Sequence, residues 1–337
     1  MAMRKREESN MRNRKGNFAS FDCANALCFA VLALLLMSFF PARAAAQQKG
    51  QKTFASPEEA SKALHTAAKN NDEKALLELF GPDGKRIISS GDEADDAQHR
   101  ANFAARYEEM NRLVREPDGS VTLYVGPHNW PYPVPLKKKG DAWYFDAVAG
   151  EKEIVFRRIG RNEMSAIRIC QELVAGQREF YAEQKNVYAQ KIFSDEGKKD
   201  GLYWKAAEGE RPSPIGPLVA WAVADEYAKS RGAEAVPYRG YYFHVLTGQG
   251  KESPGGAKSY IVDSKMTQGF AFVAYPAEYR SSGVMTFLVN QDGVIYQRDL
   301  GKKTDSIAKA MKEFDPGAGW QKAETEQEEA AAGQTTR

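Results

Sequence analysis

Apolar residues recur every three or four positions where the main part of the chain begins, which predicts helices. Ser56 is placed to cap the first of them, because Pro57 takes its first position and two glutamates fill its first turn. A second, shorter helix is predicted over Glu73–Phe80 and a third over about Asp95–Val114. A Gly-Pro-Asp-Gly turn at 81–84 separates the last two, so a helical layer comes first.

Strands are predicted to follow this helical layer. Residues Ser120–Val125 alternate between apolar and polar, as in a strand with one buried face. The segment Asn129–Leu136 (NWPYPVPL) holds three prolines, which remove ladder donors and favour an edge strand. Ala142–Ala147 (AWYFDA) and Glu153–Arg158 are predicted to complete an antiparallel sheet.

A longer helix is predicted to open the second half of the chain, starting at Asn162-Glu163. Its apolar positions recur at spacings of three and four and form one face: Ala166, Ile167, Cys170, Leu173, Val174, Phe180 and Tyr181. Strands are predicted after it at Tyr241–Leu246 and Phe270–Tyr275, with a hairpin over 283–299. A last helix is expected over Ser306–Phe314. Residues 321–337 are polar, acidic and small, and are predicted to be a disordered tail.

The N-terminus has the order of features found in a secretory signal peptide. Basic residues precede an apolar run, Ala24–Phe40, and the small residues Ala42-Arg43-Ala44-Ala45-Ala46 follow it. We therefore predict a signal peptide over 1–46 with cleavage after Ala46, or alternatively after Ala44. The rival interpretation is an uncleaved anchor, for which this apolar run is at the short end of the spanning range.

Loss of residues 1–46 would change the charge of the chain. The segment carries seven of the 47 Lys and Arg residues and three of the 45 Asp and Glu residues, so the remainder is close to neutral. The slight excess of basic residues in the whole chain therefore comes from the leader. Nucleic-acid binding thereby loses its main support, and we expect none.

The sequence offers little that is typical of catalysis or metal binding. Cys170, the one cysteine outside the leader, lies on the apolar helix face and is expected to be a buried thiol. The four histidines show no metal-binding spacing, so we predict no metal site and no cofactor. An acidic loop at 92–96 could hold calcium, but capping of the following helix by Asp95-Asp96 is the favoured interpretation. No nucleophile motif is present, and we assign no catalytic residue.

Helices followed by a curved antiparallel sheet, with the W-Y-F-D strand at 143–146, resemble the NTF2-like (cystatin-like) α+β cone over residues 54–158. Cones of this class often enclose an apolar pocket. Aromatic residues on the neighbouring predicted strands are therefore candidates for binding residues, with ordinary core packing as the alternative. The candidates, with the histidine just before them, are Trp130, Tyr132, Trp143, Tyr144 and His128.

The second half resembles the soluble domain of pilin or pseudopilin-type proteins. The matching pieces, in order, are N-E-x-x-A-I at 162–167, G-Y-Y-F at 240–243, F-A-F-V-A-Y-P at 270–276 and the hairpin over 283–299. A polymerising pilin needs a leader directly before an apolar half-helix, whereas residues 47–158 intervene here and Arg157, Arg158 and Arg161 are charged. The resemblance thus implies a pilin-like domain over 159–320 that does not polymerise.

Taken whole, residues 54–320 resemble an uncharacterised family of exported bacterial proteins, a domain of unknown function. Its marks are W-P-Y-P-V-P-L at 130–136, R-R-I-G-R-N-E at 157–163, D-G-L-Y-W at 200–204 and S-P-I-G-P-L at 213–218. The expected fold class is α+β with two domains, 54–158 and 159–320, each with a helix packed on a mainly antiparallel sheet.

These features predict an exported cell-envelope protein, periplasmic or extracellular, that acts as a non-catalytic binding or interaction module. Its partner would be an envelope protein or polymer, and it would meet the membrane only through the signal peptide before cleavage. The alternative is a periplasmic hydrolase with a site in the cone pocket or in the interdomain cleft. That class requires His and carboxylate side chains to converge, with His128, or His244 with Asp200, as the residues to inspect.

Overall fold

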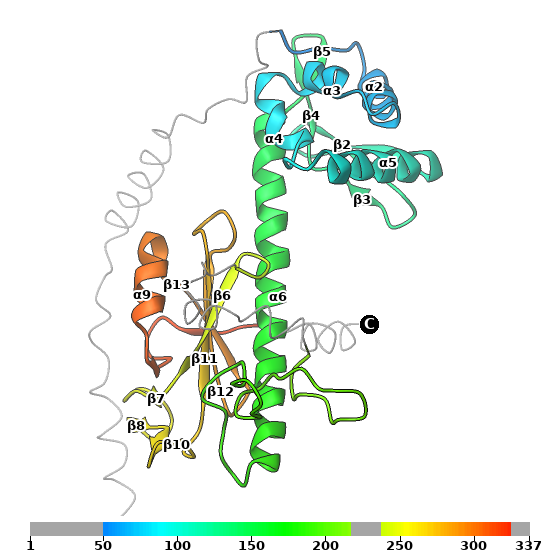
Figure 1. Cartoon of the computed structure of the whole chain (residues 1–337). Coiled ribbons are helices and arrows are strands. Elements are labelled where there is room, and N and C mark those ends of the chain that lie inside the picture. The colour runs from blue at the N-terminus through cyan, green and yellow to red at the C-terminus, as the bar shows by residue number, and fades with distance from the viewer. Residues whose placement is uncertain (1–49, 217–236, 325–337) are drawn as a thin grey trace, which may run out of the picture. The chain divides into compact units, whose positions relative to one another are not determined.

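The computed structural model describes residues 50–216 and 237–324 (Figure 1). These residues form both helices and open, mainly antiparallel sheets, so the predicted α+β class is confirmed. The predicted signal peptide over 1–46 lies outside the described residues, and so does most of the predicted tail.

The helical layer begins as its capping residues predict. The Oγ atom of Ser56 accepts a hydrogen bond from Glu59 N at the start of α2 (Pro57–Lys69), and Asp72 caps α3 (Glu73–Phe80) in the same way through Ala75 N. The turn at 81–84 forms the 3₁₀-helix η1 (Pro82–Gly84), and α4 (Lys85–Ile88) follows directly. Local capping thus places the starts of α2 and α3.

The third predicted helix ends earlier than expected. Helix α5 spans Glu93–Glu109, and residues predicted as its last turn form strand β1 (Asn111–Arg115) instead. β1 pairs antiparallel with β2 (Val121–Val125), with Leu113 opposite Leu123. The predicted helix end at Val114 was therefore wrong. The short N-R-L-V-R segment fits both the helical and the strand periodicity, and pairing with β2 makes it a strand.

Proline limits the next part of this sheet. Of the predicted strand Asn129–Leu136, only β3 (Trp130–Pro131) and the first residue of β4 (Leu136–Lys139) pair with β2. The residues between carry two further prolines, which cannot donate to a ladder. Strand β5 (Ala142–Phe145) pairs with β4 and completes the order β1-β2-β4-β5, with β3 on β2.

A single helix of 37 residues, α6 (Ala147–Glu183), replaces the predicted strand at Glu153–Arg158, so that prediction was wrong. Asp146 caps the helix by accepting from Ala149 N, and Arg157 Nε donates to Glu153 Oε1 at 2.8 Å, one turn back. A Cβ at Gly150 would collide with Val134, so glycine permits the close approach of α6 to the first sheet. Figure 1 shows α6 as one continuous helix, drawn in green.

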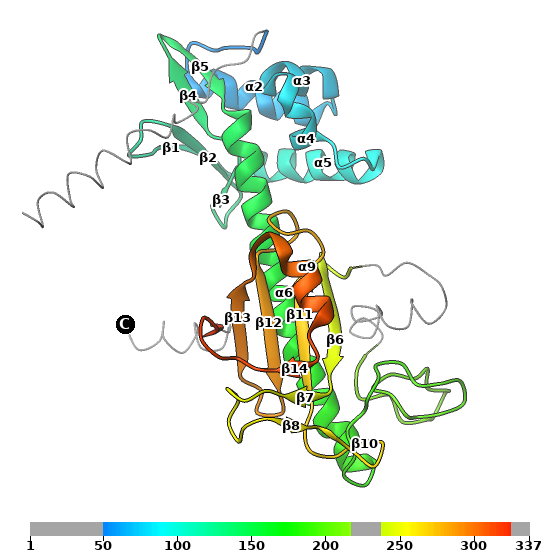
Figure 2. The same ribbon diagram turned by 90° about the vertical axis from the view of Figure 1, so that its left-hand side faces the viewer.

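The second sheet has five strands in the order β15-β13-β12-β11-β6. Its strands are β6 (Tyr241–Leu246), β11 (Ala271–Pro276), β12 (Met285–Asn290), β13 (Ile295–Asp299) and β15 (Gln321–Lys322). All six residues of β11 are buried, because α6 covers one face of the sheet and α9 (Thr304–Ala310) the other (Figure 2). The sequence predicted that a long helix packs on this sheet. It did not predict that the last helix, α9, covers the other face.

Short strands extend the structure beyond this sheet. Strand β14 (Glu313–Phe314) pairs in parallel with β7 (Gly248–Gln249), which pairs antiparallel with β8 (Lys258–Ser259). A further pair joins β9 (Ile261–Val262) to β10 (Lys265–Met266), and the 3₁₀-helix η2 (Gly301–Lys303) leads into α9. The predicted last helix therefore stops at Ala310, because β14 uses the following residues. The predicted tail starts too early at 321, since β15 pairs with β13 and Ala323 is buried.

Buried apolar residues form two clusters that both include residues of α6. The first joins α2, α3 and the β1–β5 sheet and takes Ala147 from the helix. The second joins the five-stranded sheet and takes the run from Ala166 to Phe180. Two clusters agree with the two cores expected from the sequence, and the division into domains at residue 158 stays a prediction.

Helix α6 supplies a direct test of this packing. Leu173 is fully buried against the second sheet, and Glu172, its neighbour in the helix, is exposed. Leu173→Ala should lower the free energy of unfolding by roughly 2–5 kcal/mol, since it removes buried methyl groups and leaves a cavity. Glu172→Ala should change it little. Thermal or urea unfolding of both variants measures this, and equal stability of the two would contradict the observed packing.

Candidate functional site

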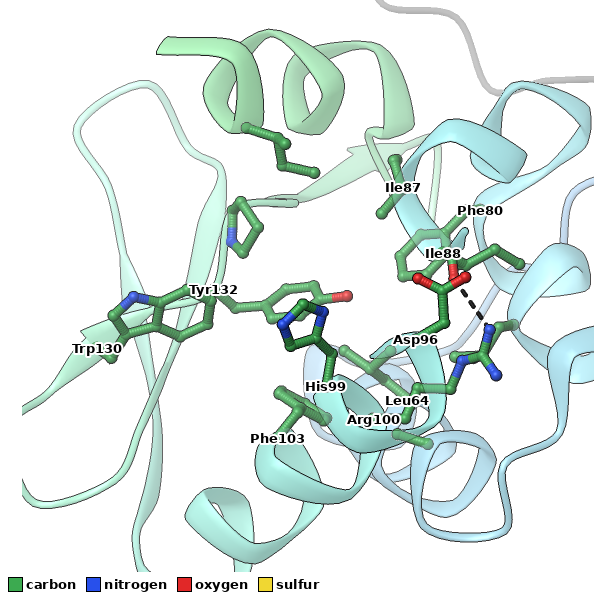
Figure 3. Close-up of a pocket in the computed structure, with 14 residues that line it drawn as sticks. Leu64, Phe80, Ile87, Ile88, Asp96, His99, Arg100, Phe103, Trp130 and Tyr132 are labelled. Atoms are coloured by element: carbon green, nitrogen blue, oxygen red, sulfur yellow. Dashed lines mark hydrogen bonds between the residues drawn. The ribbon is translucent and has the colours of Figure 1, made fainter. Parts of the chain in front are cut away.

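A pocket of about 220 Å³ opens between α2, α3, α5, β3 and the start of α6 (Figure 3). Most of its wall is apolar, from side chains of Leu64, Ala68, Leu76, Phe80, Ile87, Ile88, Phe103, Pro133 and Ile154. Trp130 and Tyr132 add an aromatic side, and Asp96, His99 and Arg100 add a polar one. The lining fits a compact apolar or aromatic group, because a dry cavity of roughly 150 Å³ holds a benzene ring.

Helix α5 positions all three polar residues. Asp96, His99 and Arg100 are three and four residues apart, so they share the face of α5 that looks into the pocket in Figure 3. The helix itself is anchored by Asp92, whose Oδ1 accepts from Ala94 N and Asp95 N. The acidic segment therefore caps the helix through Asp92 and not through Asp95-Asp96 as the sequence favoured, because the helix begins two residues earlier, and this cap sets where the three side chains project.

Both Asp96 and Arg100 are already engaged in structural hydrogen bonds. The two oxygens of Asp96 accept from Ser90 N at 2.9 and 3.0 Å. Arg100 donates Nη1 to Asn71 Oδ1 at 2.6 Å and Nη2 to Ile88 O at 2.9 Å. Although partial desolvation favours the neutral acid, the bonds from Ser90 and the charge of Arg100 lower the pKa of Asp96. The pair thus ties the loop before α5 to the helix.

Tyr132 is the polar group best placed for a ligand. Its ring packs against Phe103, with centroids 5.1 Å apart, and against Trp130 at 6.3 Å. Burial raises the pKa of Tyr132, so its hydroxyl stays protonated at neutral pH. Among the described residues this hydroxyl has no hydrogen-bond partner, and Figure 3 shows it directed into the pocket.

The five binding residues suggested by the sequence occupy different places. Trp130 and Tyr132 line the pocket, with Trp130 also stacked on Arg157, whose Cζ lies 5.3 Å from the ring. Trp143 and Tyr144 do not line it. Both are buried in β5, and His128 is exposed in the turn before β3. Alternation along β5 placed Trp143 and Tyr144 on opposite faces of the sheet, so the two could not share one pocket.

Sequence reasoning missed the contribution of α5. Asp96, His99, Arg100 and Phe103 recur at helical spacing, which was a usable signal for one helix face. The pattern did not reveal that this face turns toward the aromatic residues of β3, because that depends on how α5 packs on β2 and α2.

Comparison with known protein families matches residues 51–323 to the family described as protein of unknown function DUF2950. The chain belongs to the DUF2950 family. The resemblance to an uncharacterised family that its motifs suggested is thereby confirmed. No curated protein and no solved structure matches the chain.

The histidine and carboxylate groups named as marks of an enzyme are engaged elsewhere in this DUF2950 member. His244 Nε2 lies 3.1 Å from the carbonyl oxygen of Met311. Asp200 accepts from Asp195 N at 2.9 Å and lies 2.9 Å from Lys191 Nζ. His128 is exposed. These contacts hold loops and strand ends together, and none of them lies at the α5 pocket.

Three further properties of the described residues bear on function. Nowhere in 50–216 or 237–324 do three or more His, Cys, Asp or Glu side chains gather in a way that could hold a metal ion. Within the same ranges, no helix combines the length and the apolar character needed to cross a membrane. Burial raises the pKa of the Cys170 thiol to about 12, so it is protonated at neutral pH.

The Asn162-Glu163 motif in the DUF2950 chain attaches the second sheet to α6. Glu163 Oε1 accepts from Val284 N at 2.8 Å and Met285 N at 3.0 Å, where β12 begins. Asn162 Nδ2 donates to Ser282 O at 2.8 Å. A Cβ at Gly283 would collide with Tyr241, so the loop can approach this closely only with glycine there. The motif therefore has a structural role.

Replacement of Glu163 tests this attachment. Glu163→Ala leaves two backbone N–H groups without their acceptor, which typically costs about 1–3 kcal/mol of unfolding free energy. Glu163→Gln keeps an oxygen at the same place and should cost less. Urea unfolding compares the two variants with the parent. If Glu163→Gln were as destabilising as Glu163→Ala, the hydrogen bonds would not be the source of the effect.

The hydrogen bonds of the Asp96 carboxylate predict that the stability of the fold depends on pH. Because the folded-state pKa of Asp96 is lowered, its contribution to stability is present above the ordinary value of 3.8 and is lost as the pH falls below it. Asp96→Asn should therefore melt below the parent at pH 7, and the difference should shrink toward about pH 2.5. Asp141→Asn, at an exposed carboxylate, is the control. A difference that stays constant over this range would contradict the assigned role of the charge.

Proposed function

We propose that this DUF2950 protein is an exported cell-envelope protein and acts as a non-catalytic binding module. Its binding site is the α5 pocket, which takes a compact apolar or aromatic group presented by an envelope partner. The observation that carries the proposal is an apolar pocket of about 220 Å³ into which the Tyr132 hydroxyl is directed, with no hydrogen-bond partner for that hydroxyl among the described residues. An occupant would bury its apolar part against the wall and accept a hydrogen bond from Tyr132.

The chemistry of the polar side supports binding over hydrolysis. A general base needs a carboxylate or imidazole that is free to take a proton at working pH. Both oxygens of Asp96 accept from Ser90 N, and its lowered pKa makes it a poor base. His99 lines the pocket but is largely exposed, and its Nδ1 lies 3.7 Å from Asp95 Oδ2. The hydrolase alternative would have to use groups other than this carboxylate.

Export and the two domain resemblances support the same proposal. The apolar run Ala24–Phe40 and the small residues up to Ala46 are typical of a cleaved signal peptide. Helices packed on the β1–β5 sheet around an apolar pocket fit an NTF2-like cone. A long helix packed on an antiparallel sheet fits a pilin-like domain that no longer polymerises, which suits an interaction module.

Filling the pocket tests the proposal. Ile154→Trp places a large ring in the pocket from α6, whereas Lys152→Trp places the same ring on an exposed part of that helix. Binding of p-cresol, measured by saturation-transfer NMR, should be lost in Ile154→Trp and kept in Lys152→Trp. Tyr132→Phe removes one neutral hydrogen bond and should weaken binding about threefold to tenfold.

Pull-down from envelope extracts then links the pocket to a partner. A partner captured by the parent and by Lys152→Trp, but not by Ile154→Trp, is the expected result. The variants must melt like the parent for the comparison to count. If p-cresol binding and partner capture are both unaffected by Ile154→Trp, the pocket is not the binding site and the proposal fails.

A further inference from the structure

A second cavity, of about 620 Å³, lies at the C-terminal end of α6, far along the chain from the α5 pocket. Four lysines and one carboxylate line it, Lys185, Lys191, Lys199, Lys265 and Asp200. We refer to it as the lysine-lined cavity. Its excess of positive charge distinguishes it from the apolar α5 pocket and predicts a different class of ligand.

Hydrogen bonds between distant segments build this cavity. Tyr188 N donates to Met266 O at 2.8 Å, and Gln190 Nε2 donates to Ser264 O at 2.9 Å. These bonds hold the segment after α6 against β10 and so bring Lys185 and Lys191 to the same cavity as Lys265. The turn that makes this possible has two consecutive left-handed residues, Lys185 at φ 53° and Asn186 at φ 66°. Asparagine adopts this conformation readily, whereas lysine does so rarely.

The lysines of the cavity are only partly neutralised. Lys191 lies between Asp195, at 2.6 Å, and Asp200, at 2.9 Å. Lys199 lies 3.7 Å from Glu210 and 5.5 Å from the centre of the Trp204 ring. Within the part of the chain that the structure describes, no carboxylate pairs with Lys185 or Lys265. An anionic ligand could therefore reach two ammonium groups without displacing an existing ion pair.

Neutral polar groups complete the lining. Gln184 and Gln190 bring side-chain amides, whose oxygens can accept hydrogen bonds from hydroxyl groups. Tyr188 is stacked on Tyr181, with ring centroids 4.3 Å apart, and burial raises the pKa of Tyr188 so that its hydroxyl remains a donor. Ammonium groups for carboxylates, together with amides and an aromatic ring for hydroxyl-bearing rings, are the groups that an acidic sugar requires.

We propose that the lysine-lined cavity binds an acidic oligosaccharide, with Lys185 and Lys265 as the groups that receive its carboxylates. This site is separate from the α5 pocket and does not depend on the function proposed for that pocket. In an exported protein, such a site would attach the chain to an anionic polysaccharide of the envelope.

The experiment measures binding of a uronate hexasaccharide by calorimetry in about 0.1 M salt, with a neutral hexasaccharide of the same linkage as a second probe. The double variant Lys185→Gln with Lys265→Gln should weaken uronate binding about tenfold, since a solvent-exposed ion pair contributes up to about fivefold. The matched control is Lys152→Gln with Lys302→Gln, two exposed lysines away from the cavity. It should bind like the parent, and higher salt should weaken binding in both.

The results separate the possibilities. Undiminished binding in the double variant, equal binding of the neutral hexasaccharide, or no binding of the uronate by the parent would each overturn the proposal. Inorganic polyphosphate that binds as tightly, with the same dependence on Lys185 and Lys265, would overturn the assignment to a sugar. Ile154→Trp, which fills the α5 pocket, should leave uronate binding unchanged, so the two proposed sites fail or succeed independently.

Discussion

Burial of the apolar side of α6 is the constraint on which the rest of the structure depends. A helix of this length is about 55 Å long, and no single small core can cover it. Its first turn enters the cluster formed with the β1–β5 sheet, while the run from Ala166 to Phe180 enters the cluster beneath the five-stranded sheet. The helix passes from one core to the other near Arg157 and Arg158. Arg157 donates to Pro131 O in β3 of the first sheet, and Arg158 donates to Ser281 O in the loop before β12 of the second. One helix therefore serves as a wall of both cores.

Polar contacts set the register that apolar burial alone would leave open. Apolar contacts are non-directional, whereas Glu163 accepts hydrogen bonds from two particular N–H groups, those of Val284 and Met285. Fixing the start of β12 fixes the ladder with β11, in which Ala271 lies opposite Asn290. A shift of one residue would move every side chain of the strand to the other face of the sheet and so into the other helical layer. The motif that resembled a pilin signature is therefore explained by packing.

The two candidate sites differ because their surroundings differ. The α5 pocket lies among side chains of the first cluster, so Asp96 and Arg100 are used to hold loops and the Tyr132 hydroxyl in it stays neutral. The lysine-lined cavity lies where α6 ends and the chain turns through Lys185, so charged side chains project into it without burial in a core. The two proposed sites, one for an apolar group and one for an anion, thus lie at opposite ends of one helix, and the character of each follows from the local dielectric.

The sequence by itself determined the elements whose signals are local. Ser56 with Pro57 marked the start of α2, and Asp72 led directly into α3. The α+β class followed from such signals. Only the tertiary structure decided that Glu153–Arg158 is helical and that α5 turns its Asp96 face toward Tyr132. The physical reason is that caps and turns act within a few residues, while a short segment of mixed pattern takes the period of whatever it packs against, and a pocket exists only where distant segments meet.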